Sequence, residues 1–147
     1  MTTTRPSRHG IMTYIQLQPE SALPDISRLA PFRCVVVVED VPTSDWQTKV
    51  SCWLVRSGCL YMMAWGNGCS SWDDSVDMAN LAEFNYEAIP EDRFVMTTWH
   101  KDDSMSEVFW FSKNCAHHAD VDIQNTVILH ISAVNRESDF RKAYEGA

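Results

Sequence analysis

The chain has 147 residues, of which 45% are hydrophobic and 22% are charged, and its formal net charge is −8. This length suits one domain that buries a hydrophobic core without disulfides or a metal. The excess of acidic residues argues against a nucleic-acid partner, because a phosphate backbone would be repelled, and it fits either ordinary solubility or a basic protein partner.

The cysteines and the N-terminus indicate a reducing compartment. Five cysteines are an odd number, and they include no CxxC pair. Arg5 and Arg8 are not followed by the apolar segment of a signal peptide. No apolar run approaches the ~20 residues of a membrane span, so no membrane association is predicted. We therefore expect a cytoplasmic protein with a loose tail at residues 1–10 and a single domain at 11–147.

Strand-like and helix-like segments alternate from the start of this domain. Tyr14–Gln18 alternates apolar and polar residues, as a half-buried edge strand does, and its pairing could be antiparallel. Cys34–Val38 reads CVVVV, which is typical of a central parallel strand buried on both faces. From Ser44 the apolar residues follow one helical face until Gly58, a suitable C-terminal stop.

The same alternation continues to the C-terminus. Ser104 and Glu107 have the spacing of a capping box at the start of one helix. Ser71 and Asp74 repeat that spacing at the start of another. The remaining predicted elements are strands at 60–65, 94–99 and 126–132, each followed by a helix, at 71–84, 104–116 and 135–145.

Strands that alternate with helices predict an α/β fold with right-handed crossovers. We expect a three-layer α/β/α sandwich around a mainly parallel sheet of four to five strands, Rossmann-like or flavodoxin-like in the broad sense. Because such folds host many activities, the function must be argued from a site.

The predicted site is the edge of the sheet formed by the carboxyl ends of its strands, where parallel sheets bind ligands. Trp65 and Trp99 end strands there and Trp72 follows closely, so that an aromatic surface could stack a planar ring or anchor a protein partner. The candidate ligand-binding residues are Asp40, Trp65, Gly66, Asn67, Gly68, Ser70, Ser71 and Trp99.

Cys69, His100 and Glu39 form the candidate catalytic set. Cys69 follows a glycine turn and precedes a helix N-terminus, a setting that lowers the pKa of a thiol. His100 could act as its base, with Glu39 or Asp73 orienting the imidazole. The competing interpretation is an ordinary loop cysteine, since no nucleophile motif surrounds it.

Three other sequence patterns are weaker indications of a phosphate or metal site. Gly66-Asn67-Gly68 resembles part of a phosphate loop, but it is neither GxGxxG nor a Walker motif, and a tight turn explains it. Glu39-Asp40 could bind Mg²⁺ or a ribose hydroxyl, or be a solvated strand end. Cys115, His117 and His118 lack a second ligand pair, so no metal site is predicted. His130 is expected to be a core or sheet-face histidine, and no cofactor is identified.

Most of the chain from Tyr14 onward resembles a small bacterial family of uncharacterised domains. The stretches that carry the resemblance are RCVVVVED, WLVRSGCLYMMAWG, CSSWDDSVDMANL, RFVMTTWH and EVFWFSKNCAHH. The resemblance implies a bacterial, cytoplasmic, single-domain protein, and it carries no activity or site residues.

We therefore expect a small soluble α/β binding or accessory domain that recognises a protein partner or a small planar ligand at the carboxyl ends of the strands. Two other classes stay open. One is a thiol- or carboxylate-dependent enzyme that acts on a nucleotide-like or glycosidic substrate. The other is an acidic immunity-type protein that masks a basic toxin.

Overall fold

Five parallel strands form one sheet in the computed structural model, which describes residues 10–147. The expected tail, residues 1–10, lies outside the described residues except for Gly10. In chain order the elements are β1 (Met12–Leu17), η1 (Ser27–Leu29), β2 (Phe32–Val38), α1 (Ser44–Ser57), β3 (Cys59–Gly66), η2 (Cys69–Ser71), α2 (Trp72–Glu83), η3 (Glu91–Arg93), β4 (Met96–Trp99), α3 (Met105–Asn114), β5 (Asn125–Ile131) and α4 (Glu137–Gly146), where η denotes a 3₁₀ helix.

The strand order is β1-β5-β2-β3-β4, which confirms the predicted parallel sheet. β1 lies at an edge, as expected, but the antiparallel alternative is wrong. It runs parallel to β5 in a continuous register from Met12 opposite Thr126 to Leu17 opposite Ile131. The connection from residue 18 to residue 31 carries the chain back along one face, so that β2 starts at the same end of the sheet as β1.

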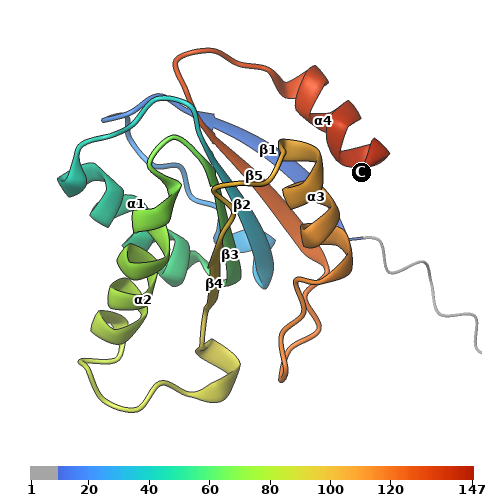
Figure 1. Cartoon of the computed structure of the whole chain (residues 1–147). Helices are drawn as coiled ribbons and strands as arrows, with labels where there is room; N and C mark the ends of the chain where they lie inside the picture. Colours follow the sequence, from blue (N-terminus) through green and yellow to red (C-terminus); the bar gives the residue numbers. More distant parts are fainter. Residues whose placement is uncertain (1–9) are drawn as a thin grey trace, which may run out of the picture.

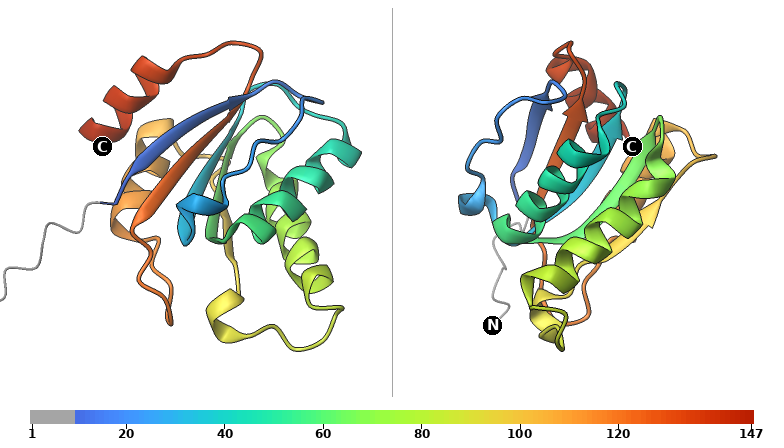
Figure 2. Two further views of the ribbon diagram at one scale, coloured as in Figure 1. Left: turned by 180° about the vertical axis from the view of Figure 1, so that it is seen from behind. Right: turned by 90° about the vertical axis from the view of Figure 1, so that its left-hand side faces the viewer.

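Helices cover both faces of the sheet, with α1 and α2 on one side and α3 and α4 on the other (Figures 1 and 2). The chain moves from β2 to β3 to β4 with its helices on the first face, and then returns to β5 across the second. Right-handed crossovers require this change of face when the direction of travel reverses. Two hydrophobic cores result, one on each side of the sheet.

This topology defines the place where a ligand is expected. Strands β4-β3-β2-β5 follow the first four positions, 3-2-1-4, of the Rossmann strand order, and β1 extends the sheet beyond β5. The fold is therefore an α/β fold of Rossmann or flavodoxin type, as predicted. After β2 the chain turns to α1 on one face, and after β5 it turns to α4 on the other. The carboxyl ends of β2 and β5 thus flank the topological switch point of the sheet.

Two of the helix ends predicted from the sequence form as expected, and a third does not. At α3 the Ser104 hydroxyl accepts a hydrogen bond from the Glu107 N–H, and the Glu107 carboxylate accepts one from the Ser104 N–H, which confirms this capping box. Gly58 ends α1 with a φ of 101°, and a Cβ there would lie 2.3 Å from the Cβ of Ala30. The capping box predicted at Ser71 is wrong, because η2 precedes α2 directly and holds Ser71 in a helical conformation. Its hydroxyl instead donates to the Gly68 carbonyl.

Within residues 10–147, no helix has both the length and the apolar character that crossing a membrane would require.

Candidate functional site

A line of hydrogen bonds joins β1, β5 and the end of β2 at the switch point. His130 is fully buried on β5, with its Nδ1 2.6 Å from the Tyr14 hydroxyl and its Nε2 3.2 Å from Glu39 Oε1. The Tyr14 hydroxyl accepts the N–H of Arg136 at 2.9 Å. Burial raises the pKa of Tyr14, so the phenol keeps its proton and can donate it to Nδ1. When Nδ1 accepts this proton donor, the neutral imidazole carries its own proton on Nε2 and donates it to Glu39.

Glu39 receives a second donor from β5. The Ser132 hydroxyl donates to Glu39 Oε2 at 2.9 Å, and its oxygen accepts the N–H of Val134. These hydrogen bonds, first from Ser132 and then from His130, lower the pKa of Glu39. The ionised carboxylate therefore stabilises the folded state at neutral pH, and this contribution is lost as the pH falls through the lowered pKa. The side chain stays 40% exposed, so its remaining lone pairs face solvent.

The backbone around Glu39 is fixed from both neighbouring strands. The N–H groups of Glu39 and Asp40 both donate to the Ile131 carbonyl at 3.0 Å, and Asp40 Oδ2 accepts the N–H of Ala133. From the β3 side, the Asn67 amide donates to the Glu39 carbonyl at 2.8 Å. The loop is thus held in position before any ligand binds, which lowers the entropic cost of binding.

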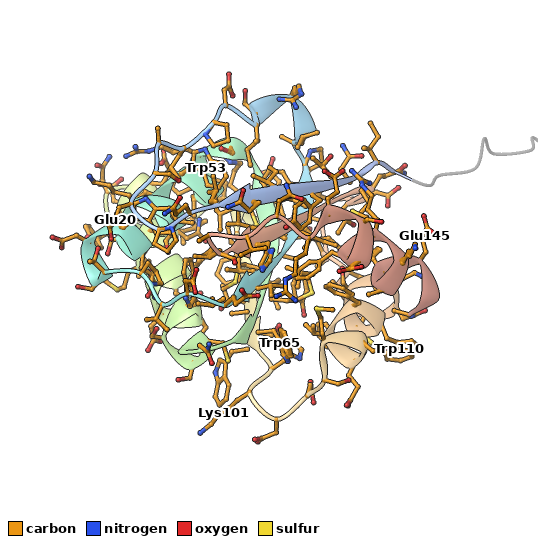
Figure 3. All side chains as sticks on the ribbon, turned by 90° about the horizontal axis from the view of Figure 1, so that it is seen from above. Glu20, Trp53, Trp65, Lys101, Trp110 and Glu145 are labelled. Carbon is orange, nitrogen blue, oxygen red and sulfur yellow. The ribbon has the colours of Figure 1, made fainter. Side chains whose placement is uncertain are left out.

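A cleft of about 320 Å³ opens beside Glu39. Figure 3 looks down on the carboxyl ends of the strands and shows Trp65 on the side of the sheet that α3 covers. The Trp65 indole donates to the Asp103 carbonyl at 2.7 Å, which fixes the ring. The side chains that give the cleft its chemistry are Glu39, Trp65, Asn67, Met105, Arg136 and Phe140. The cleft is therefore mainly apolar, with a carboxylate and a guanidinium at its border.

The structure places several predicted residues together and separates others. Trp65, Gly66 and Asn67 line the cleft with Glu39, and Asp40 adjoins it. Gly66 has a φ of 104°, and a Cβ there would lie 2.3 Å from the Val38 carbonyl oxygen, so only glycine lets β3 end this close to β2. The remaining predicted ligand-binding residues, Gly68, Ser70, Ser71 and Trp99, are exposed and lie outside the cleft.

The predicted thiol–imidazole pair is not formed. Cys69 is 2% exposed and packs into the core beneath α1 and α2. His100 hydrogen-bonds to Asp103 and Thr98 and packs against Phe111 of α3, which belongs to the opposite face of the sheet. The reason is that the loop after β3 folds toward α2, whereas the chain after β4 folds toward α3. Glu39 accordingly orients neither residue and is bonded to His130 and Ser132.

The sequence interpretation missed most partners of Glu39. The sequence predicts a core or sheet-face histidine at position 130, and His130 is buried, but its two ring nitrogens also connect Tyr14 to Glu39. Ser132 was recognised only as a strand end. The sequence does contain a signal that His130 and Ser132 belong together, because residues two apart in a strand lie on the same face of the sheet. Its meaning depends on β5 lying between β1 and β2.

No group of three or more His, Cys, Asp or Glu side chains between residues 10 and 147 is arranged to hold a metal ion. The two neighbouring histidines have other partners. His117 bonds the Asn114 carbonyl, and His118 bonds the Phe94 carbonyl and the N–H of Asp120.

Cysteine reactivity gives a test of this arrangement. Cys34, Cys59 and Cys69 are buried, Cys52 is partly buried and Cys115 is exposed. Burial raises the pKa of the Cys59 thiol to about 12 and that of Cys34 well above its usual range. Brief alkylation of the native protein, followed by peptide mass spectrometry, should therefore modify Cys115 first. The lowered thiol pKa that the sequence predicts for Cys69 would instead make Cys69 the fastest to react. Modification of Cys69 as fast as Cys115 would show that η2 is open in solution.

Comparison with known proteins identifies the family of the chain but gives no information on its activity. A search of curated proteins and a search of solved structures each found no match. A family model described as a domain of unknown function (DUF7684) matches residues 12–147, from the first residue of β1 onward. The match includes every strand and helix of the sheet and all the residues of the cleft, and it confirms that the family is an uncharacterised one. The chain belongs to the DUF7684 family.

Proposed function

We propose that this protein is a small cytoplasmic binding domain that holds a planar organic molecule in the cleft at the switch point. The observation that carries the proposal is the Tyr14–His130–Glu39 line of hydrogen bonds, which ends in an ionised, partly exposed carboxylate beside the Trp65 ring. Five free thiols and no disulfide in the described chain support the reducing compartment.

The chemistry of the cleft favours a ligand with hydrogen-bond donors. Each oxygen of Glu39 already accepts one donor from the protein, and each keeps acceptor capacity for an amino or hydroxyl group. Such charge-assisted bonds are stronger than neutral ones. Trp65 is only partly buried and offers its ring to a planar ligand, and the volume suits one small ring system.

Binding is favoured over catalysis by the protonation states. A general acid or base works best with a pKa near the operating pH, whereas the pKa of Glu39 is lowered from an already acidic value. His130 is fully buried with both nitrogens engaged, so it cannot reach a ligand. The Ser132 hydroxyl is fully buried and donates to Glu39, and the lowered pKa of that carboxylate makes it a weak base for activating a nucleophile.

The same cleft disfavours a phosphate group. In dinucleotide-binding folds the turn after the first strand of the Rossmann half is glycine-rich and cradles a pyrophosphate. The corresponding turn here follows β2 and contains Glu39 and Asp40, with no glycine before α1. We therefore propose an uncharged or cationic ring compound, with nucleosides and free bases as the first class to examine.

Glu39→Gln tests the proposal. Glutamine keeps an acceptor for His130 and a donor for Ser132, so the fold is expected to remain intact while the charge is lost. In a titration with purine and pyrimidine nucleosides, the Trp65 indole N–H resonance, assigned with Trp65→Phe, should shift. The substitution should weaken binding about tenfold or more, since hydrogen bonds to charged groups contribute ~1.5–3 kcal/mol.

Glu87→Gln is the matched control, because Glu87 is exposed in the connection between α2 and β4. It should bind each nucleoside as the native protein does, and the corresponding monophosphates should bind the native protein more weakly. If no nucleoside shifts the Trp65 resonance, or if Glu39→Gln binds as tightly as the native protein, the proposed ligand class is wrong.

A further inference from the structure

β4 has an unpaired edge. It pairs with β3 alone, and among the described residues no strand lies on its other side. The His100 N–H donates to the Ala64 carbonyl at 2.9 Å. Because a parallel ladder engages alternate residues, the backbone groups of Thr97 and Trp99 point away from β3. Such an edge is a template on which another extended chain can pair.

Hollows lie on both faces of the sheet beside this edge. Thr97 bonds Asp77 of α2, and on that face a hollow of about 400 Å³ is lined by these residues and by Leu81 and Val95. On the face of the α3–β5 connection, a hollow of about 290 Å³ is lined by Met96 and Asp120 among others. An added strand points successive side chains to opposite faces, so the two hollows would receive neighbouring side chains.

The hollows are apolar inside and acidic at their borders. Phe94 and Met96 are 45% and 40% exposed and contribute to both. Asp77 borders the first hollow, and Glu91 and Asp120 border the second. Burial, and then the charges of Asp73 and Asp74, raise the pKa of Asp77, so two further carboxylates of α2 lie near the first hollow. A second copy of this chain would bring the same acidic groups against them, so like charges disfavour self-association.

We propose that the free edge of β4 binds an extended basic segment of a protein partner by strand addition. The backbone of the segment pairs with Thr97 and Trp99. Lysine or arginine side chains lay their apolar stems in the two hollows and direct their charged groups to Asp77, Glu91 and Asp120. This surface is separate from the cleft at Glu39, so the proposed protein partner would bind in addition to the small ligand.

The test uses fluorescein-labelled heptapeptides in which lysine and valine alternate, in both registers, with glutamate in place of lysine as the matched control. Fluorescence anisotropy should show binding of the lysine peptides and at least about tenfold weaker binding of the glutamate peptides. Hydrogen exchange should show new protection at the amides of Thr97 and Trp99 when a lysine peptide is bound.

Two variants separate strand addition from general electrostatic attraction. Thr97→Pro removes an outward N–H from an edge strand and should abolish binding, whereas Thr97→Val keeps the N–H and should bind. Asp120→Asn leaves the backbone unchanged and should weaken the lysine peptides severalfold, which keeps the test valid if Thr97→Pro does not fold.

Three outcomes would overturn the proposal. One is the absence of binding by every lysine peptide at millimolar concentration. Another is equal binding of lysine and glutamate peptides. The third is dimerisation of the chain alone in sedimentation velocity, lost in Thr97→Pro and retained in Thr97→Val, because a second copy would then occupy the edge.

Discussion

Replacement of Val36 by Asp is expected to lower the free energy of unfolding by about 4 kcal/mol or more, which is the range of an unpaired charge in a core. Val36 is fully buried in β2, between Ala64 of β3 and Leu129 of β5. Its side chain belongs to the core beneath α1 and α2, where its neighbours are hydrophobic. A carboxylate there must either remain charged without a partner or bind a proton at high cost.

Urea unfolding followed by circular dichroism measures this effect. Val41→Asp is the matched control, because Val41 is 64% exposed in the connection between β2 and α1. It should change the free energy of unfolding by less than about 0.5 kcal/mol, as exposed substitutions generally do. A soluble Val36→Asp variant with an unchanged midpoint would contradict the central position of β2.

The sheet was predictable because its signals are local. Four consecutive valines, Val35–Val38, form a strand that is apolar on both faces, and only a strand covered on both sides satisfies that pattern. Gly58 and the Ser104 capping box likewise act within a few residues of their own position. The alternation of such strands with helices then implies parallel pairing, and the structure confirms it.

The site was only partly predictable because its contacts are distant in sequence. Glu39 is 91 residues from His130, and Tyr14 is 116 residues from the same imidazole. These three meet only because β5 inserts between β1 and β2. The predicted residues that line the cleft, such as Trp65 and Asn67, lie at or just after the end of β3, where the general rule for parallel sheets places ligand-facing residues. The partners of Glu39 required the strand order.

The thiol hypothesis shows the limit of local reasoning. The sequence around Cys69, a glycine turn followed by a helix, predicts a thiol at an exposed helix N-terminus. The turn η2 instead adds one 3₁₀ turn before α2, and the side chain of Cys69 enters the core. Whether Cys69 stands in a loop before the helix or inside this added turn decides whether its side chain is exposed, and the sequence contains no signal that distinguishes the two.

The second large effect on the free energy of unfolding is expected for a tryptophan near the carboxyl ends of the strands. Trp72→Ala is expected to lower the free energy of unfolding by about 3–5 kcal/mol, since the large cavity would be lined by apolar groups. Trp72 is 1% exposed at the start of α2 and packs in the core with Val76. Trp99 ends β4 and is 46% exposed, so Trp99→Ala should cost less than about 1 kcal/mol, as substitutions at exposed positions do.

Thermal and urea unfolding of the two variants side by side measure the difference between these positions. Both substitutions remove the same indole, so the expected difference of several kcal/mol reflects mainly burial, because the helix and strand preferences of alanine contribute only about 1 kcal/mol. Trp72→Phe is the intermediate control, because it keeps an aromatic ring in the core and should recover part of the lost stability. A loss for Trp99→Ala that equals or exceeds the loss for Trp72→Ala would mean that the end of β4 is packed in solution, and a packed edge would not be open to another strand.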